Sequence, residues 1–142
     1  MTDEAFARAF EAGAVRPEEF DHVAHLRVAW VYLREAGSAD AALPRIRAAI
    51  QRFAAAAGAA QKYHETITVV WMRLLEDAGV EAPRSCELSE LLRQHPDLGD
   101  KNLPLKHYSR ERLFSDVARE AYVPPDLESG GTNPKSQFPT PK

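Results

Sequence analysis

The sequence predicts an all-α fold, a compact helical bundle of four main helices followed by shorter C-terminal helices and a mobile tail. Apolar residues recur at helical spacing over most of the chain, without the alternation of apolar and polar residues that is typical of strands. Serine or threonine precedes several of these segments and glycine follows them, as at helix ends. The composition, 44% apolar and 27% charged over 142 residues, is typical of one globular domain. We place this domain at residues 1–123 and the tail, rich in proline, glycine and polar residues, at 124–142.

The first two helices have recognisable ends. Residues 2–13 form a short amphipathic segment that Thr2 can cap. The second helix runs from about Asp21 to Ala36 and ends at Gly37, because glycine readily adopts the left-handed conformation that closes a helix.

The third and fourth helices follow directly. Ser38 is the expected N-cap of the third helix and Gly58 its end. Pro44 lies beyond the first turn, where it removes a helical hydrogen bond, so we expect a kink or a later true start. The fourth helix is expected from about Gln61 to Ala78, with Gly79 as its end. The apolar stripe of the third helix consists of Leu43, Ile46, Ile50, Phe53 and Ala57.

The C-terminal third is predicted as short pieces. Residues 85–94 form a helix that is closed by His95 and Pro96, and residues 97–108 form a packed loop. Residues 109–114 and 115–122 are two helical segments, each with a serine in the capping position.

Charge and composition exclude several classes of function. The net charge is −3 and the isoelectric point about 6.0, which argues against binding to nucleic acid. No apolar run reaches the length of a membrane span, no basic amphipathic helix suggests a membrane surface, and the N-terminus lacks the build of a secretion signal. We therefore expect a cytoplasmic protein without a nucleic-acid or membrane partner. A homodimer is compatible with the sequence.

The single cysteine, Cys86, excludes an intrachain disulfide and a zinc site built from several cysteines. Its position at an expected helix start could activate a catalytic thiol. Because the sequence offers it no identifiable partner, we interpret it as a partly buried small residue.

Histidines occupy the apolar faces of two helices. On the second helix, Arg27 and Arg34 mark the solvent side, and His25 lies nearly opposite them with His22 beside it. On the fourth helix, His64 lies opposite the charged face. We therefore expect the second and fourth helices to be neighbours, with a polar pocket between them that is lined by His22, His25 and His64, with Glu65, Tyr32, Tyr63 and Thr68 nearby.

Three interpretations of these histidines remain open. The first is a metal site, in which His22, His25 and His64 hold a divalent ion such as zinc, iron or copper. The second is a metal-free pocket for acid–base chemistry, in which His64, Glu65 and His25 are catalytic and Tyr32, Tyr63 and Thr68 bind the substrate. The third is a satisfied polar network that fixes the register of the helices.

Four basic residues of the C-terminal third, Lys106, Arg110, Arg112 and Arg119, could meet an anion near this pocket. Ordinary surface charge is the simpler explanation for them.

An F-x-H-x-x-H opening of one helix, a YHETIT-like segment on another and a late tyrosine-serine stretch before a PDL occur in this order along the chain. Together they resemble a family of small uncharacterised bacterial all-α proteins, a domain of unknown function. The F-x-H-x-x-H motif starts at Phe20, and the YHETIT-like segment starts at Tyr63. The resemblance covers residues 18–127, and the tail after Leu127 departs from it. The matching positions are Phe20, His22, His25, Tyr63, His64, Glu65, Thr66 and Thr68. The resemblance implies an all-α fold and supplies no activity.

The leading functional hypothesis is an enzyme or small-ligand binder that uses this pocket for acid–base or metal-assisted chemistry. The alternative is a non-catalytic interaction or structural protein whose histidines form the satisfied network.

Overall fold

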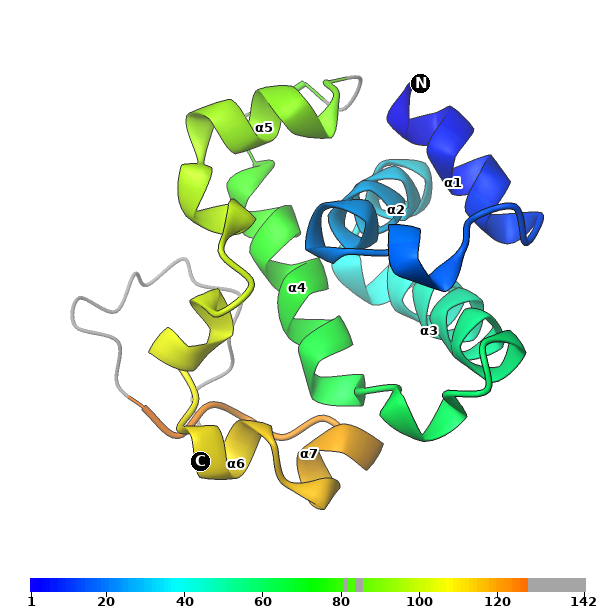
Figure 1. Ribbon diagram of the computed structural model, residues 1–142. Coiled ribbons are helices and arrows are strands. Elements are labelled where there is room, and N and C mark those ends of the chain that lie inside the picture. Colours follow the sequence, from blue (N-terminus) through cyan, green and yellow to red (C-terminus); the bar gives the residue numbers. More distant parts are fainter. Residues whose placement is uncertain (81, 84–85, 128–142) are drawn as a thin grey trace.

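The computed structural model describes residues 1–80, 82–83 and 86–127, and in these ranges it contains helices and no strand (Figure 1). The predicted all-α class is therefore confirmed. The α-helices in these ranges are α1 (Asp3–Glu11), α2 (His22–Ala36), α3 (Ala39–Ala56), α4 (Glu65–Ala78), α5 (Leu88–Gln94), α6 (Arg110–Leu113) and α7 (Asp116–Glu120). Short 3₁₀ helices lie between them at η1 (Pro17–Glu19), η2 (Ala60–Lys62), η3 (Pro96–Gly99) and η4 (Leu103–Lys106).

Helix α2 is the centre of the N-terminal half. It packs against α1, α3 and α4, and α3 also packs against α4. The predicted contact between the second and fourth helices is therefore confirmed. Figure 1 shows α5 near the end of α4, and α6 and α7 near its beginning. None of the helices in the described ranges combines the length and the apolar character that crossing a membrane requires.

Helix α4 is buried on two sides. Trp71, Met72 and Leu75 belong to the main core with α2 and α3. Val70 belongs to a second, smaller core with Tyr108, Leu113, Ala118 and Val123 from the C-terminal region. This arrangement explains why the segment "ITVVWMRLL" is apolar around most of the helix.

Several predicted helix ends are present. The hydroxyl oxygens of Thr2, Ser38, Ser109 and Ser115 each accept a hydrogen bond from the backbone N–H three residues later. Gly37 ends α2 with a φ of 93°, which is accessible to glycine at little cost. These caps fix the starts of α1, α3, α6 and α7.

Pro44 does not delay the start of α3, so that alternative is wrong. The helix begins at Ala39 and continues through Pro44. Pro44 and Asp40, whose carbonyl loses its helical partner there, are both exposed. Water can therefore satisfy the carbonyl, and the helix tolerates the proline.

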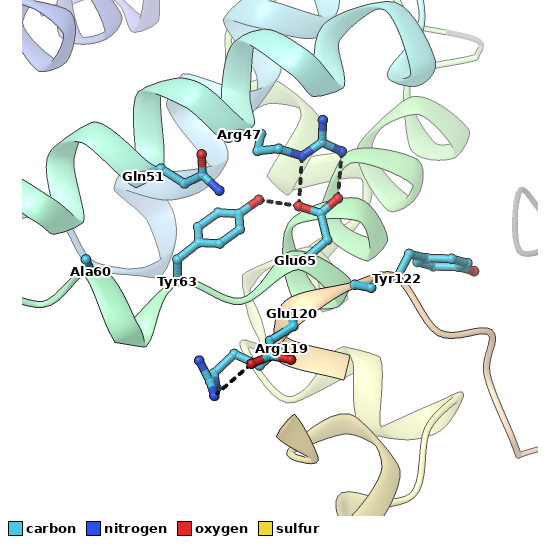
Figure 2. Close-up of a pocket in the computed structure, with 9 residues that line it drawn as sticks. Arg47, Gln51, Ala60, Tyr63, Glu65, Arg119, Glu120 and Tyr122 are labelled. Carbon is cyan, nitrogen blue, oxygen red and sulfur yellow. Dashed lines mark hydrogen bonds and ion pairs between the residues drawn. The ribbon is translucent and has the colours of Figure 1, made fainter. Parts of the chain in front are cut away.

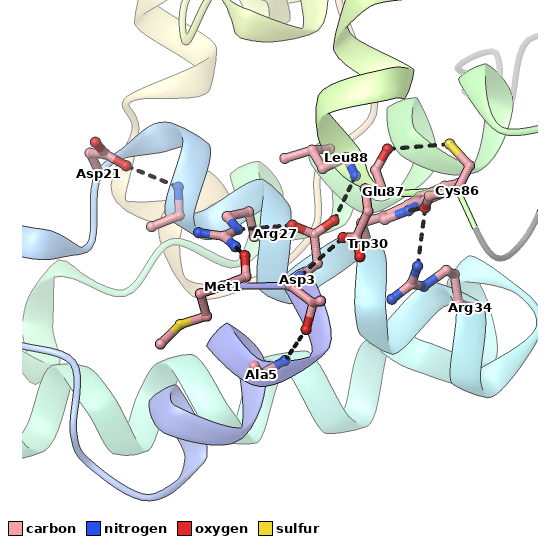
Figure 3. Close-up of polar contacts among 12 residues, drawn as sticks. Met1, Asp3, Ala5, Asp21, Arg27, Trp30, Arg34, Cys86, Glu87 and Leu88 are labelled. Carbon is pink, nitrogen blue, oxygen red and sulfur yellow. Dashed lines mark hydrogen bonds and ion pairs between the residues drawn. The ribbon is translucent and has the colours of Figure 1, made fainter.

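A polar network connects α1, α2 and the start of α5 (Figure 3). Asp3 is only 4% exposed, and its carboxylate accepts hydrogen bonds from Arg27 Nε at 2.8 Å and from the Leu88 N–H at 2.6 Å. Trp30 Nε1 donates to the carbonyl of Cys86 at 2.7 Å. Burial raises the pKa of the Cys86 thiol, which is the opposite of what an activated thiol would need.

Residues 124–127 are attached to the helical domain, although we assigned them to the tail. Arg112 Nε donates to the carbonyl of Pro124 at 2.6 Å, and the Asp126 carboxylate accepts from both the N–H and the hydroxyl of Ser109. The Leu127 N–H donates to the carbonyl of His107. The rest of the predicted tail, residues 128–142, lies outside the described residues.

Candidate functional site

The two histidines of α2 lie in different surroundings. The His22 ring packs against the Trp71 ring of α4, with centroids 4.5 Å apart, and its Nε2 is 2.8 Å from the carbonyl oxygen of Leu98. The His25 ring lies edge-on to Phe20, with centroids 6.0 Å apart. Burial, and then the neighbouring His22, lower the pKa of His25 to about 4. His25 is therefore neutral at physiological pH.

His64 caps α4 and does not lie within it, which corrects the predicted start of this helix. Residues 60–62 form the 3₁₀ helix η2, and α4 begins only at Glu65. His64 Nδ1 accepts a hydrogen bond from the Ile67 N–H at 3.1 Å. Its Nε2 lies 2.7 Å from the carbonyl oxygen of Leu113 in α6, so the neutral ring donates there and both nitrogens are used.

The predicted metal site is not formed. No group of three or more histidine, cysteine, aspartate or glutamate side chains that could hold a metal ion occurs among the described residues. Seven residues, about 10 Å of helix axis, separate His64 from Trp71, against which His22 packs. His22, His25 and His64 therefore do not meet.

Tyr32, predicted to bind substrate, points into a different polar cluster. It is 1% exposed, and its hydroxyl donates to Glu11 at 2.6 Å. The Arg45 guanidinium lies over its ring, 4.1 Å from the centroid. Tyr32 thus joins α1, α2 and α3 and is not among the residues that line a pocket with Tyr63.

Tyr63 and Glu65 do meet, together with Arg47 of α3 (Figure 2). Arg47 donates from Nε to Glu65 Oε1 at 2.9 Å and from Nη2 to Oε2 at 2.6 Å. The Tyr63 hydroxyl donates to Oε1 at 2.7 Å. Glu65 is only 9% exposed, so these three bonds compensate for the burial of its charge.

The two threonines of the motif are bonded in different ways. The Thr66 hydroxyl donates to the carbonyl of Ala121 at 3.0 Å and accepts from the Val123 N–H at 3.1 Å, which ties the C-terminal segment to α4. The Thr68 hydroxyl donates to the carbonyl of His64 at 2.9 Å, within one turn of its own helix. Thr68 therefore does not line the pocket described next.

A polar pocket of about 620 Å³ opens beside Tyr63 and Glu65. We call it the Tyr63 pocket. Figure 2 shows one wall from α3 and the η2 region, and an opposite wall from the end of α7 and the residues after it. The lining residues are Arg47, Gln51, Ala60, Tyr63, Glu65, Arg119, Glu120, Ala121 and Tyr122. Among the described lining residues, two arginines and two glutamates balance in charge.

The central groups of the Tyr63 pocket keep fixed charges near neutral pH. Hydrogen bonds from Arg47 lower the pKa of Glu65, although burial opposes the effect. Burial raises the pKa of Tyr63 to about 12. The lining contains no histidine and no cysteine, the side chains that most readily exchange protons near neutrality. The fixed charges and hydrogen-bonding groups of the pocket can hold a polar ligand.

Arg47, like Gln51 and Glu120 of the same lining, was not predicted as a site residue from the sequence. It follows Leu43 by four residues and precedes Ile50 by three, so helical spacing places it beside the apolar stripe of α3. A charged residue in that position requires a buried partner, and this signal could have pointed to Glu65. Arg119, interpreted above as surface charge, lies on the opposite wall of the pocket.

Comparison of the chain with protein-family models, with curated proteins and with solved structures found no match. The resemblance carried by the F-x-H-x-x-H and YHETIT-like motifs therefore stays a prediction.

Proposed function

We propose that this protein binds a small, uncharged or zwitterionic polar molecule in the Tyr63 pocket. The observation that carries the proposal is the balanced, hydrogen-bonding lining of a pocket built from three separate segments of the chain. Ligand pockets in proteins combine such a concave surface with a few fixed polar groups.

The class of ligand follows from the groups that the pocket leaves available. Glu65 and Arg47 neutralise each other, so neither offers an uncompensated charge to a ligand. Gln51 is exposed and can offer both a donor and an acceptor, and the Tyr63 oxygen can accept a further bond. A sugar-like polyol, an amide or an amino acid carries donors and acceptors that match these groups. A strongly anionic or cationic ligand would instead be repelled by the lining side chains of the same charge.

Catalysis is not part of this proposal. The acid–base interpretation relied on His64, Glu65 and His25, and of these the lining of the Tyr63 pocket includes Glu65 but neither histidine. A binding role is supported by the fixed protonation states of Glu65 and Tyr63.

The test is ligand-observed NMR with four sets of probes: neutral polyols and amides, free amino acids, monocarboxylates and alkylammonium ions. We expect binding from the first two sets. Gln51→Ala and Tyr63→Phe should each weaken it about fivefold, the effect of about one lost hydrogen bond. Tyr32→Phe is the matched control, because its hydroxyl also bonds a glutamate but lies outside the pocket. Binding that is unchanged in Gln51→Ala and Tyr63→Phe, or its absence for all probes, would overturn the proposal.

A second candidate is the non-catalytic interaction protein, with histidines that serve the fold. It is supported by the bonds of His22 and His64 to backbone carbonyls of distant segments. Affinity purification would then recover the same macromolecular partner with wild-type protein and with Gln51→Ala. Loss of that partner in the pocket variant would count against this candidate.

A further inference from the structure

His64 connects the start of α4 to the end of α6. Its Nδ1 accepts from the Ile67 N–H, and its Nε2 donates to the Leu113 carbonyl, 49 residues further along the chain. Helix α7 follows α6 after two residues, and residues 119–122 at its end form one wall of the Tyr63 pocket. The imidazole therefore helps to hold the segment that carries this wall.

We propose that His64 is a pH-sensitive latch, which holds the α6–α7 wall of the Tyr63 pocket against α4 and releases it in mildly acidic solution. The proposal rests on the function proposed above for that pocket. The latch itself is a property of the fold and can be measured without any ligand.

The chemistry of release follows from the two bonds of the ring. When Nδ1 takes up a proton from water, it becomes a donor and can no longer accept from the Ile67 N–H. The new positive charge also lies at the N-terminus of α4, where the helix dipole disfavours cations. The ring must then turn away from its capping position, and its bond to Leu113 is lost with that movement.

The surroundings of His64 favour the neutral form. Burial lowers the pKa of His64 below its usual value of 6.5, the Leu113 carbonyl raises it, and the Arg119 cation of α7 lowers it. Glu65, the adjacent residue, directs its carboxylate to Arg47 of α3. A released ring, free in water, would titrate near 6.5, so proton uptake drives release as the pH falls below that value.

The wall has two further polar attachments that do not titrate near neutral pH, and the first is the bond from Arg119 Nη1 of α7 to the carbonyl of Gln61, at 3.1 Å. The second is the Thr66 hydroxyl, which bonds Ala121 and Val123 and does not titrate between neutral and mildly acidic pH. Protonation of His64 should therefore loosen α6 and the start of α7, while these bonds keep the far end of the wall attached and the domain folded.

The experiment is residue-resolved amide hydrogen exchange from about pH 7.5 to about pH 5, corrected for intrinsic rates and combined with an NMR titration of the imidazole. In the wild type, protection of the Ile67 and Phe114 amides should fall about tenfold along the titration curve of His64. His64→Asn is the matched variant, because asparagine caps helices well and does not titrate, and its protection should not change with pH.

Two results would overturn the latch. One is a His64 imidazole that stays neutral throughout this range, and the other is protonation that leaves the protection of Ile67 and Phe114 unchanged. If His64→Asn does not fold, the wild-type titration alone decides between these outcomes. A chain that binds no probe but releases α6 with pH would refute the proposed function and keep the latch. Ligand binding without pH-dependent release of α6 would refute the latch and keep the proposed function.

Discussion

Arg47 holds Glu65 across the contact between α3 and α4 through two parallel hydrogen bonds, of 2.9 and 2.6 Å. Arg47 keeps 38% of its side chain exposed, whereas Glu65 keeps 12%. The pair is thus asymmetric, because the carboxylate is dehydrated and the guanidinium remains partly in water. Removing the arginine should cost more than an ordinary surface ion pair, since it leaves the buried carboxylate with the Tyr63 hydroxyl alone.

We therefore expect Arg47→Met to lower the free energy of unfolding by about 2 kcal/mol at neutral pH. Urea denaturation measures this change. Arg52→Met, at an exposed position of the same helix, is the control and should change stability by less than about 0.5 kcal/mol. Arg47→Met combined with Glu65→Leu should recover part of the loss, because the orphaned charge is then gone. Equal losses for Arg47→Met and Arg52→Met would contradict a buried, coupled pair.

The two threonines of the YHETIT-like segment allow a matched comparison. Thr66→Val keeps the shape of the side chain but removes both hydrogen bonds to the segment at Ala121 and Val123. We expect a loss of about 2 kcal/mol and faster hydrogen exchange at the Val123 amide. Thr68→Val removes a bond to its own helix and the contact of its hydroxyl with Tyr63, but no bond to the C-terminal segment, and should cost less than about 1 kcal/mol. Equal exchange at Val123 in the two variants would show that Thr66 does not anchor this segment.

The outcome for the histidines shows which features of this fold the sequence can predict. The contact of α2 with α4 followed from the apolar faces of both helices. Arg27 and Arg34, expected on the solvent side of α2, are instead half-buried and bond Asp3 and the carbonyl of Cys86. Helical spacing alone placed His64 inside the fourth helix. Histidine is not among the common capping residues, so nothing in the local pattern marked the later start.

The partners of the polar residues could not be derived in the same way. Leu98, Leu113 and Ala121 contribute backbone carbonyls, which every residue possesses, so their side chains carry no signal of these bonds. Such long-range bonds depend on how η3, α6 and the segment after α7 fold back on α2 and α4. The charge of Arg47 beside an apolar stripe was, in contrast, visible in the sequence.

His25 should make the stability of the protein depend on pH. Burial lowers its pKa to about 4 in the folded chain, against the ordinary histidine value of 6.5, so the unfolded chain binds more protons between these pH values. Stability is therefore lost as the pH falls from about 6.5 towards about 4. The free energy of unfolding of the wild type, minus that of His25→Leu, should fall by about 2 kcal/mol between pH 7 and pH 4.5.

Urea denaturation of both proteins at several pH values gives this difference, in which contributions from other titrating groups cancel. An NMR titration of the His25 ring provides an independent value. A difference that stays constant with pH would mean that His25 titrates alike in the folded and unfolded chain.

Asp3 should anchor the start of α5 to α1. Burial raises the pKa of Asp3, but the hydrogen bonds that its carboxylate accepts from the Leu88 N–H and from Arg27 outweigh this effect and the pKa is lowered overall, so the carboxylate is ionised at neutral pH. Asp3→Ala leaves the Leu88 N–H without the oxygen that now lies 2.6 Å away, and we expect a loss of about 2 kcal/mol. Hydrogen exchange at the Leu88 amide should accelerate more than exchange in α3, because the lost bond is local to α5. Glu4→Ala, at the exposed neighbouring position, is the control and should leave Leu88 protected. If both variants expose Leu88 equally, the carboxylate of Asp3 is not what holds α5 in place.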